Sequence, residues 1–391
     1  MKVSGTGRAG NSENKHKMKI GILGTRGIPN AYGGFEQFTQ YLAMGLFQKG
    51  HEIYVYNSSD HPYQEPEWNG IQIIHCKDWE SKIGTAGQFL YDYNCLMDAR
   101  RRNFDVLIQL GYTSNSIWRR IWPKGMIHMI NMDGLEWKRS KYSKPVQKFL
   151  RLAESWAVKH GDILISDSTG IQDYILEKYG KSSVYIPYGA DIPADYSTSV
   201  LEQWKLAAGG YYLVMARMEP ENNLEMILQG WLASRKIKPL VLIGNPGNGF
   251  GRYLVKTYKH ENIRFIGAIY DQQTVNAMRH YSALYFHGHS VGGTNPSLLE
   301  AMACGCTMAA HDNVFNRAIL AGETSYFSSA HEVRNIIDMG LDPAMILDRK
   351  ERNLDKIREN YNWQKIIDDY EKVLMNAKIP ANPPVGPQNS R

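Results

Sequence analysis

The sequence predicts an α/β protein made of two doubly wound domains, each with a parallel sheet between layers of helices. Two observations carry this prediction. A chain of 391 residues is too long for one ordinary hydrophobic core. Short apolar runs also alternate with helical patterns in two successive series, which is typical of parallel sheets with crossover helices. A hydrophobic content of 43% is that of a packed globular chain.

The first series of apolar runs predicts six buried parallel strands, and the first of them is followed by an amphipathic helix. That helix is expected to begin near Gly34, with Phe38, Leu42 and Leu46 on one face. The predicted strands cover residues 19–24, 52–57, 71–76, 106–111, 127–134 and 163–168.

The second series predicts another parallel sheet after a linker. The linker is the stretch at 185–199, which is rich in proline and turn-forming residues. The predicted strands cover residues 211–218, 239–245, 263–268, 283–288 and 307–311. We therefore place one domain at 18–190 and the second at 191–360, with disordered ends at 1–17 and 379–391.

Charge and composition narrow the class of function. The net charge of +6 suits anionic small molecules or an anionic membrane surface, and it is too small for a dedicated nucleic-acid binder. The four cysteines do not predict a disulfide framework, and Cys304 and Cys306 are expected to be small buried residues after a helix. Without a long apolar run or a signal-peptide pattern, a cytoplasmic protein is expected.

Ligands of doubly wound sheets bind beyond the carboxyl ends of the strands, so loops at these ends are the candidate site. The first is the loop at 24–38, with Arg26, Gly33, Gly34 and Glu36. Its glycines follow a G-x-x-G spacing, which disfavours the NAD fingerprint and favours close backbone approach to another ligand.

The second loop, at 131–142, places Asp133 at a strand end with Glu136 and Lys138 close behind. A carboxylate there can accept a proton from a substrate hydroxyl. The residues alone equally allow Asp133 to be the N-cap of the following helix.

The third and fourth loops belong to the second domain. Arg217 follows a strand and suits a diphosphate, although a surface salt bridge to Glu219 or Glu221 is the alternative. The backbone amides of the loop from Gly292 through Gly293 and Thr294 to Asn295 can form an anion nest at a helix start, with Glu300 one turn later. His287 and His289 share a strand face and suit ligand contact or packing better than a metal.

These motifs resemble the retaining GT-B glycosyltransferases of family 4, over residues 18 to 376. The strings "GGFEQFTQYLAMGLFQKGHEIYVY", "SDSTGIQDYILEKYG", "SLLEAMACGC" and "RENYNWQKIIDDYEKVL" carry the resemblance. The strings "TRGIPNAYGGFEQF", "NMDGLEWKR", "PENNLEM" and "HSVGGTNPSLLEAM" are similar to the bacterial rhamnosyltransferase branch. The resemblance implies a C-terminal helix at 361–378 that crosses back to the first domain.

The resemblance also implies roles for the loop residues. Arg217 would contact the donor diphosphate and act in catalysis, Glu300 would bind the ribose, and Asp133 would have a catalytic or acceptor-orienting role. The implied donor-binding set is Gly33, Gly34, Arg217, Asn222, His289, Gly292, Gly293, Thr294, Asn295 and Glu300. The implied acceptor-side set is Arg26, Glu36, Glu136 and Lys138.

Two positions depart from the family pattern. Gly292 stands where the family has a glutamate, and Asn222 stands where it has a lysine. The loss of one acid and one base motivates the hypothesis that the pocket takes a 6-deoxy sugar such as rhamnose on dTDP rather than glucose on UDP. Other family 4 donors such as UDP-glucose and GDP-mannose remain alternatives.

The sequence thus predicts a rhamnosyltransferase of bacterial surface polysaccharide synthesis, with a saccharide or lipid-linked saccharide as acceptor. No metal or other cofactor is expected, because no Asp-x-Asp pair follows a strand. An epimerase and a non-catalytic nucleotide-sugar-binding protein are the alternative functions. The basic stretch at 137–151, helped by 98–104, is typical of a solvated helix face or of peripheral contact with an anionic membrane.

Overall fold

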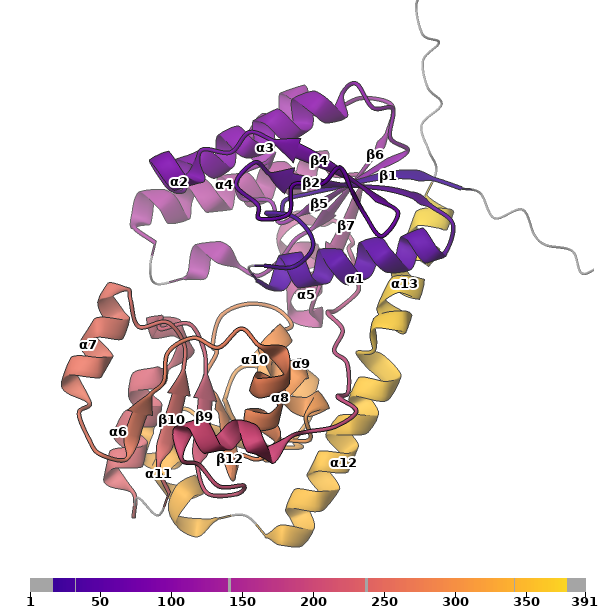
Figure 1. Ribbon diagram of the computed structural model, residues 1–391. Coiled ribbons are helices and arrows are strands. Elements are labelled where there is room, and N and C mark those ends of the chain that lie inside the picture. The colour runs from indigo at the N-terminus through magenta and orange to yellow at the C-terminus, as the bar shows by residue number, and fades with distance from the viewer. Residues whose placement is uncertain (1–16, 32, 140–141, 236–237, 341, 378–391) are drawn as a thin grey trace, which may run out of the picture.

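The computed structural model describes residues 17–31, 33–139, 142–235, 238–340 and 342–377. Two α/β lobes face each other, and two C-terminal helices run along one side of both (Figure 1). Apart from Lys17, the predicted disordered ends lie outside the described residues, and their disorder stays a prediction.

The first sheet has eight strands in the order β3-β4-β2-β1-β5-β6-β7-β8, and all neighbours are parallel except β3 and β4. The strands are β1 (Lys19–Leu23), β2 (Glu52–Ser58), β3 (Glu67–Trp68), β4 (Ile71–Cys76), β5 (Val106–Leu110), β6 (Ile127–Asn131), β7 (Ile163–Ser166) and β8 (Val184–Tyr185). The six predicted strands are all present, and β3 and β8 went unpredicted because two residues carry no periodic pattern.

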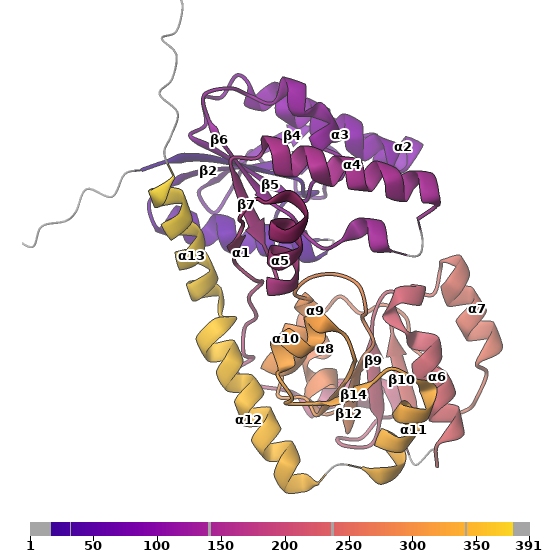
Figure 2. The same cartoon turned by 180° about the vertical axis from the view of Figure 1, so that it is seen from behind.

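Helices cover both faces of this sheet (Figure 2). They are α1 (Gly34–Gln48), α2 (Glu80–Ile83), α3 (Ala86–Ala99), α4 (Lys144–His160) and α5 (Thr169–Tyr179), with short 3-10 helices η1 (Ser116–Ile121) and η2 (Glu136–Lys138). Phe38, Leu42 and Leu46 of α1 are buried in one core, as their spacing predicts. Residues of α3, α4 and α5 form a second core on the opposite face.

The second sheet is entirely parallel, in the order β11-β10-β9-β12-β13-β14. Its strands are β9 (Tyr212–Met215), β10 (Leu240–Ile243), β11 (Ile263–Phe265), β12 (Leu284–His287), β13 (Met308–His311) and β14 (Ser325–Phe327). The helices around it are η3 (Thr198–Trp204), η4 (Pro220–Asn222), α6 (Leu224–Ala233), α7 (Gly249–Thr257), α8 (Gln272–His280), α9 (Pro296–Ala303), α10 (Val314–Leu320) and α11 (Ala330–Met339).

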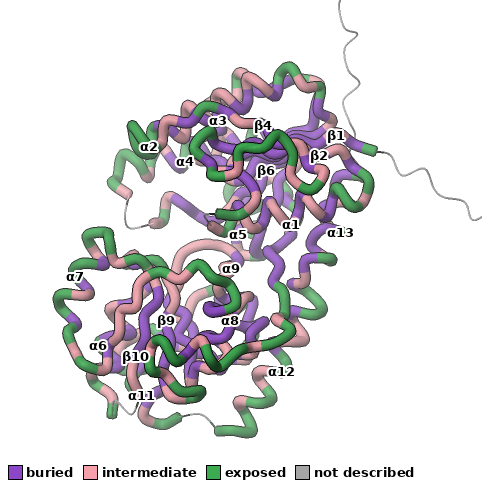
Figure 3. The backbone as a smooth tube through the Cα atoms, viewed as in Figure 1, coloured by how far each residue is buried: buried purple, intermediate pink, exposed green. Residues whose placement is uncertain are grey.

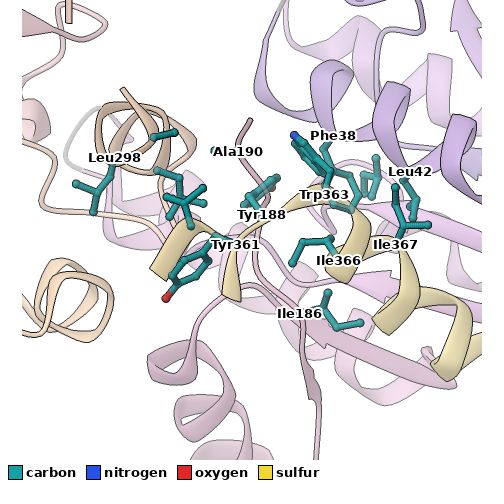
Figure 4. Packing of buried hydrophobic residues seen from close by; sticks show 14 of the residues in the cluster. Phe38, Leu42, Ile186, Tyr188, Ala190, Leu298, Tyr361, Trp363, Ile366 and Ile367 are labelled. Carbon is teal, nitrogen blue, oxygen red and sulfur yellow. The ribbon is translucent and has the colours of Figure 1, made fainter. Parts of the chain in front are cut away.

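The chain returns to the first domain through α12 (Pro343–Asn360) and α13 (Trp363–Asn376), and α13 packs on α1. Trp363 stacks on Tyr41 of α1 with ring centroids 4.3 Å apart. Around it, Tyr188 and Ala190 of the connecting segment join the same buried cluster (Figure 4). The predicted crossing of the C-terminal helix is therefore confirmed, and one apolar cluster links both domains at the connecting segment.

Burial follows this arrangement. The strands are mostly buried, and exposure is concentrated in the outer turns and helix faces (Figure 3). The four cysteines are free and buried, so the expectation of small buried residues at Cys304 and Cys306 is confirmed. No helix in the described part of the chain has the length and apolar character needed to cross a membrane.

Candidate functional site

The two sheets meet at the carboxyl ends of their central strands. Asp133 and Asp167 follow β6 and β7 of the first domain, while Arg217 and His289 follow β9 and β12 of the second. Because carboxyl ends of parallel strands share one edge, each domain presents its pair at a single edge. We call this place the interdomain site; its residues are Asp133, Arg139, Asp167, Arg217, Glu221, His289 and the loop at 288–295.

The position of Asp133 is set by its backbone conformation and a backbone hydrogen bond, and not by a helix. Its φ of 49° is left-handed, and its amide donates to Oδ1 of Asn131 at 2.9 Å. The following 3-10 helix begins at Glu136 with Leu135 in the capping position, so the helix-cap alternative for Asp133 is wrong. Burial raises the pKa of the Asp133 carboxyl, while the charges of Arg139 and Arg217 oppose that rise. This carboxyl group thus faces cations from both domains.

Arg139 joins the two domains. Its Nε donates to Oε1 of Glu136 at 2.7 Å, and its Nη1 lies 3.9 Å from Oε1 of Glu221 in the second domain. The sequence assigned Arg139 to a basic stretch on the surface, but its side chain is only 16% exposed. That assignment is wrong for Arg139, because at the end of η2 its side chain turns toward Glu136 and Glu221 rather than outward.

Arg217 and His289 form the second domain's side of the site. Arg217 is exposed, and the amide of the Asn222 side chain donates to its backbone oxygen at 2.7 Å. Asn222 therefore shapes the turn that carries Arg217. Burial, with the charges of Arg217 and Arg139, lowers the pKa of His289 to about 3. His289 is neutral near pH 7, so it can exchange hydrogen bonds with a ligand without adding charge.

His287 stacks on His289 with ring centroids 4.5 Å apart. Both ring nitrogens of His287 are buried without a hydrogen-bond partner. Burial keeps the pKa of His287 well below its ordinary value. In the part of the chain that the structure describes, no group of three or more His, Cys, Asp or Glu side chains is placed to hold a metal ion.

The loop at 288–295 lies directly against the first domain. The Thr294 hydroxyl donates to the backbone oxygen of Asp167. A Cβ added at Gly134 would lie 2.8 Å from Cα of Gly292, so the two backbones touch where neither residue has a side chain. Within the described residues, no hydrogen-bond partner is seen for the amides of Gly292 and Gly293. The loop for which an anion nest is predicted thus lies at the domain contact, and the nest itself stays a prediction.

Asn295 and Glu300 are both anchored within the second domain. The Asn295 side chain caps α9 by accepting from the Ser297 amide at 3.0 Å. Oε2 of Glu300 lies 2.6 Å from Nη2 of Arg279, whose side chain is 2% exposed. Glu300 itself keeps 20% exposure, so this buried arginine holds a carboxylate that a ligand can still reach.

In the glycine loop of the first domain, only the end near Gly34 comes close to the start of α9. A Cβ on Gly34 would lie 3.7 Å from Cγ of Pro296, the first residue of α9. The rest of the loop is tied within its own domain. Glu36 is buried and accepts from the Thr25 hydroxyl and the Arg26 amide, and Arg26 pairs with Glu80 at 2.7 Å.

The structure therefore divides the predicted residues into two groups. Asp133, Glu136, Arg217, His289 and the loop at 292–295 come together, with Gly34 and Glu300 on either side of the α9 start. Arg26 and Glu36 support their own loop, and Lys138 is exposed. For these three, the predicted contact with an acceptor remains a prediction.

Sequence reasoning missed Asp167 and Arg139. Asp167 lies at the end of a predicted strand, as Asp133 lies at the end of another, so the same strand-end rule contained the signal. Arg139 gave no such signal, because its charge was one of several in a basic stretch. Only the fold distinguishes it from exposed neighbours such as Lys138.

Comparisons with known proteins agree with this architecture. A family model described as a domain of unknown function, DUF1972, matches residues 17–191. Among solved structures, sucrose-phosphate synthase from Thermosynechococcus elongatus is similar with a TM-score of 0.75 and 15% identity, over 92% of this chain and 98% of that one. Anabaena Alr3699/HepE in complex with UDP and glucose has a TM-score of 0.71 and 13% identity, over 93% and 100%. The chain has the GT-B fold.

A relative is also similar in sequence over nearly the full length. It is an uncharacterized glycosyltransferase, MJ1069, of Methanocaldococcus jannaschii, 21% identical over 92% of this chain and 98% of its own. The likeness therefore covers both GT-B domains rather than one of them.

Proposed function

We propose that this GT-B protein is a glycosyltransferase that moves a sugar from a nucleotide-sugar donor to a saccharide acceptor. The convergence of Asp133, Arg217 and His289 at facing strand ends carries the proposal. A departing diphosphate needs a cation, and an attacking hydroxyl needs a hydrogen-bond acceptor. The relative MJ1069 is named a glycosyltransferase and HepE is described with UDP and glucose, which supports this class of reaction.

In the proposed reaction, the acceptor oxygen bonds to the anomeric carbon as the bond from that carbon to the diphosphate oxygen breaks. The acceptor's proton passes to the leaving phosphate, and the anomeric configuration is retained. Arg217 and the free amides of Gly292 and Gly293 stabilise the growing negative charge. Asp133 orients the acceptor hydroxyl, and no enzyme nucleophile takes part.

We propose dTDP-rhamnose as the donor and a lipid-linked or free saccharide of a bacterial surface polysaccharide as the acceptor. Gly292 leaves open space beside the donor loop, because a Cβ there would meet no atom within 4 Å. UDP-glucose is the second candidate, since HepE is described in complex with UDP-glucose.

The first experiment is thermal stabilisation by dTDP-rhamnose, UDP-glucose and GDP-mannose. A ligand that binds only the native state raises the melting temperature. We expect a selective shift with dTDP-rhamnose that is lost in Arg217→Ala and Glu300→Ala. A shift with another donor contradicts only the rhamnose assignment, and no shift with any donor contradicts the transferase assignment. Turnover separates the classes further, since an epimerase consumes donor without acceptor and a binding protein consumes neither.

We also propose peripheral contact with anionic membranes through α4. Lys144, Lys148 and Lys159 are exposed on this helix, and Leu152 is 45% exposed among them. Replacing the three lysines by glutamine should weaken sedimentation with phosphatidylserine vesicles at low salt. The matched control neutralises Arg252, Lys256 and Lys259, which are exposed around α7 of the second domain. If both variants lost vesicle binding equally, the binding would depend on the overall positive charge and not on α4.

A further inference from the structure

Asp167 is the least explained charged group of the interdomain site. Its side chain is 2% exposed, and its Oδ1 has no hydrogen-bond partner. Burial, followed by the charge of Asp133, raises the pKa of Asp167 well above its ordinary value. A buried carboxyl group with an unpaired oxygen is costly to the fold, which points to a role outside folding.

The position of Asp167 is defined by the loop of the second domain. The Thr294 hydroxyl donates to the backbone oxygen of Asp167, and the Thr294 backbone and the Ser168 side chain oppose the rise in the pKa of its carboxyl group. A Cβ added at Gly293 would overlap Oδ1, so this approach is open only to glycine. Asp167 thus reaches the loop that has no charged side chain of its own between His289 and Glu300.

The chemistry of Asp167 suits a hydroxyl group. A carboxylate accepts a hydrogen bond from a hydroxyl, and a protonated carboxyl can also donate one. Neither form attracts a diphosphate, because one repels it and the other is neutral. The neighbouring space at Gly292 is open, since a Cβ there meets nothing within 4 Å.

We propose that Asp167 binds a hydroxyl of the donor sugar, and that the first domain thereby supplies the acidic group that the second domain's loop lacks. This inference rests on the proposed glycosyltransferase function. The loop amides and Arg217 bind the diphosphate. Asp167 hydrogen-bonds the sugar that is attached to it. Sugar recognition then depends on the two domains being in contact, whereas Arg217 and the loop amides that hold the diphosphate belong to the second domain.

Calorimetric titration separates these contributions. The probes are dTDP with dTDP-rhamnose, and UDP with UDP-glucose. In Asp167→Ala we expect the nucleotide sugar to bind about 10- to 100-fold more weakly, as for one lost hydrogen bond to a carboxyl group. The nucleoside diphosphate should bind within about threefold of the wild type, because its contacts are unchanged. Asp173→Ala, which removes an exposed acid of α5, is the matched control and should change neither.

Asp167→Leu tests the same contact if Asp167→Ala fails to fold. Leucine is close to aspartate in size but cannot hydrogen-bond, so the same selective loss for the nucleotide sugar is expected. Equal losses for both ligands, or no loss, overturn the proposal. Tighter binding of the nucleoside diphosphate also overturns it, since Asp167 would then be competing with phosphate. A wild-type protein that binds none of the four probes contradicts the proposed function itself.

Discussion

The two glycine loops of the molecule are built in opposite ways. The loop at 24–31 is held by side chains of its own domain, among them Glu36 and Asn57, which hydrogen-bond its backbone. The loop at 288–295 is held at Ser290 by its own domain and at Thr294 by the other one. The first loop is therefore part of a fixed scaffold, while the second depends on contact between domains. Substitutions in the two loops should accordingly have different consequences.

The largest expected effect is on stability, from Gly27→Ala in the first loop. Gly27 has a φ of 125°, and an added Cβ would overlap the Asn57 side chain. Strain and overlap together should lower the free energy of unfolding by at least about 2 kcal/mol in urea titrations. Gly249→Ala is the control, because nothing lies within 4 Å of its added Cβ. A Gly27 variant as stable as this control would show that the first loop is not a rigid scaffold.

The next effect is on binding, from Gly34→Ala. An added Cβ would lie 3.7 Å from Pro296, which is an ordinary contact, so the melting temperature should stay unchanged. If a diphosphate approaches this backbone, a methyl group should weaken donor binding about tenfold or more in calorimetry, as is typical for a steric change at a contact. Gly249→Ala, also at a helix start, should bind like the wild type. Unchanged binding in Gly34→Ala would remove this loop from the donor site.

A smaller effect concerns the pH dependence of stability through Asp167. Its pKa is raised in the folded state, so folding favours the protonated form. That contribution is complete below the ordinary carboxyl pKa of about 4, and it is lost as pH rises through the folded-state value. Asp167→Asn cannot ionise, so its stability relative to the wild type should increase from pH 4 to pH 8.

Chemical denaturation of both proteins at each pH measures this difference. The gain should amount to about 1.4 kcal/mol for each pH unit by which the folded-state pKa exceeds the unfolded-state value. A difference between the two proteins that does not change with pH would mean that Asp167 is no more perturbed in the fold than an exposed acid.

The smallest expected effect is that of a chelator. Arg217 and Arg139 flank the site from the two domains, so guanidinium groups can balance the charge of a departing diphosphate. We expect EDTA to leave the transfer rate unchanged. Loss of activity that is restored by Mg²⁺ or Mn²⁺ would instead give a metal a part in the reaction.

The sequence by itself determined the class of the fold and the strand ends at which the candidate residues lie. Apolar runs fix strands locally, and loops after parallel strands must share one edge, so Asp133, Arg217 and the loop at 292–295 could be predicted from pattern. The resemblance added the crossing of the C-terminal helix, which the packing of Trp363 on Tyr41 bears out.

Only the tertiary structure decided which side chains share the site. Arg139 and Lys138 are adjacent in a basic stretch, yet one turns into the domain contact and the other toward solvent. Glu36 and Asp133 are both acids of strand-end loops, yet the Glu36 carboxyl accepts a hydrogen bond from the Arg26 amide of its own loop. Asp167 belongs to the interdomain site only because Gly293 of the second domain packs against its carboxyl group. Periodicity describes neighbours along the chain, and contacts across two domains are set by how their surfaces fit.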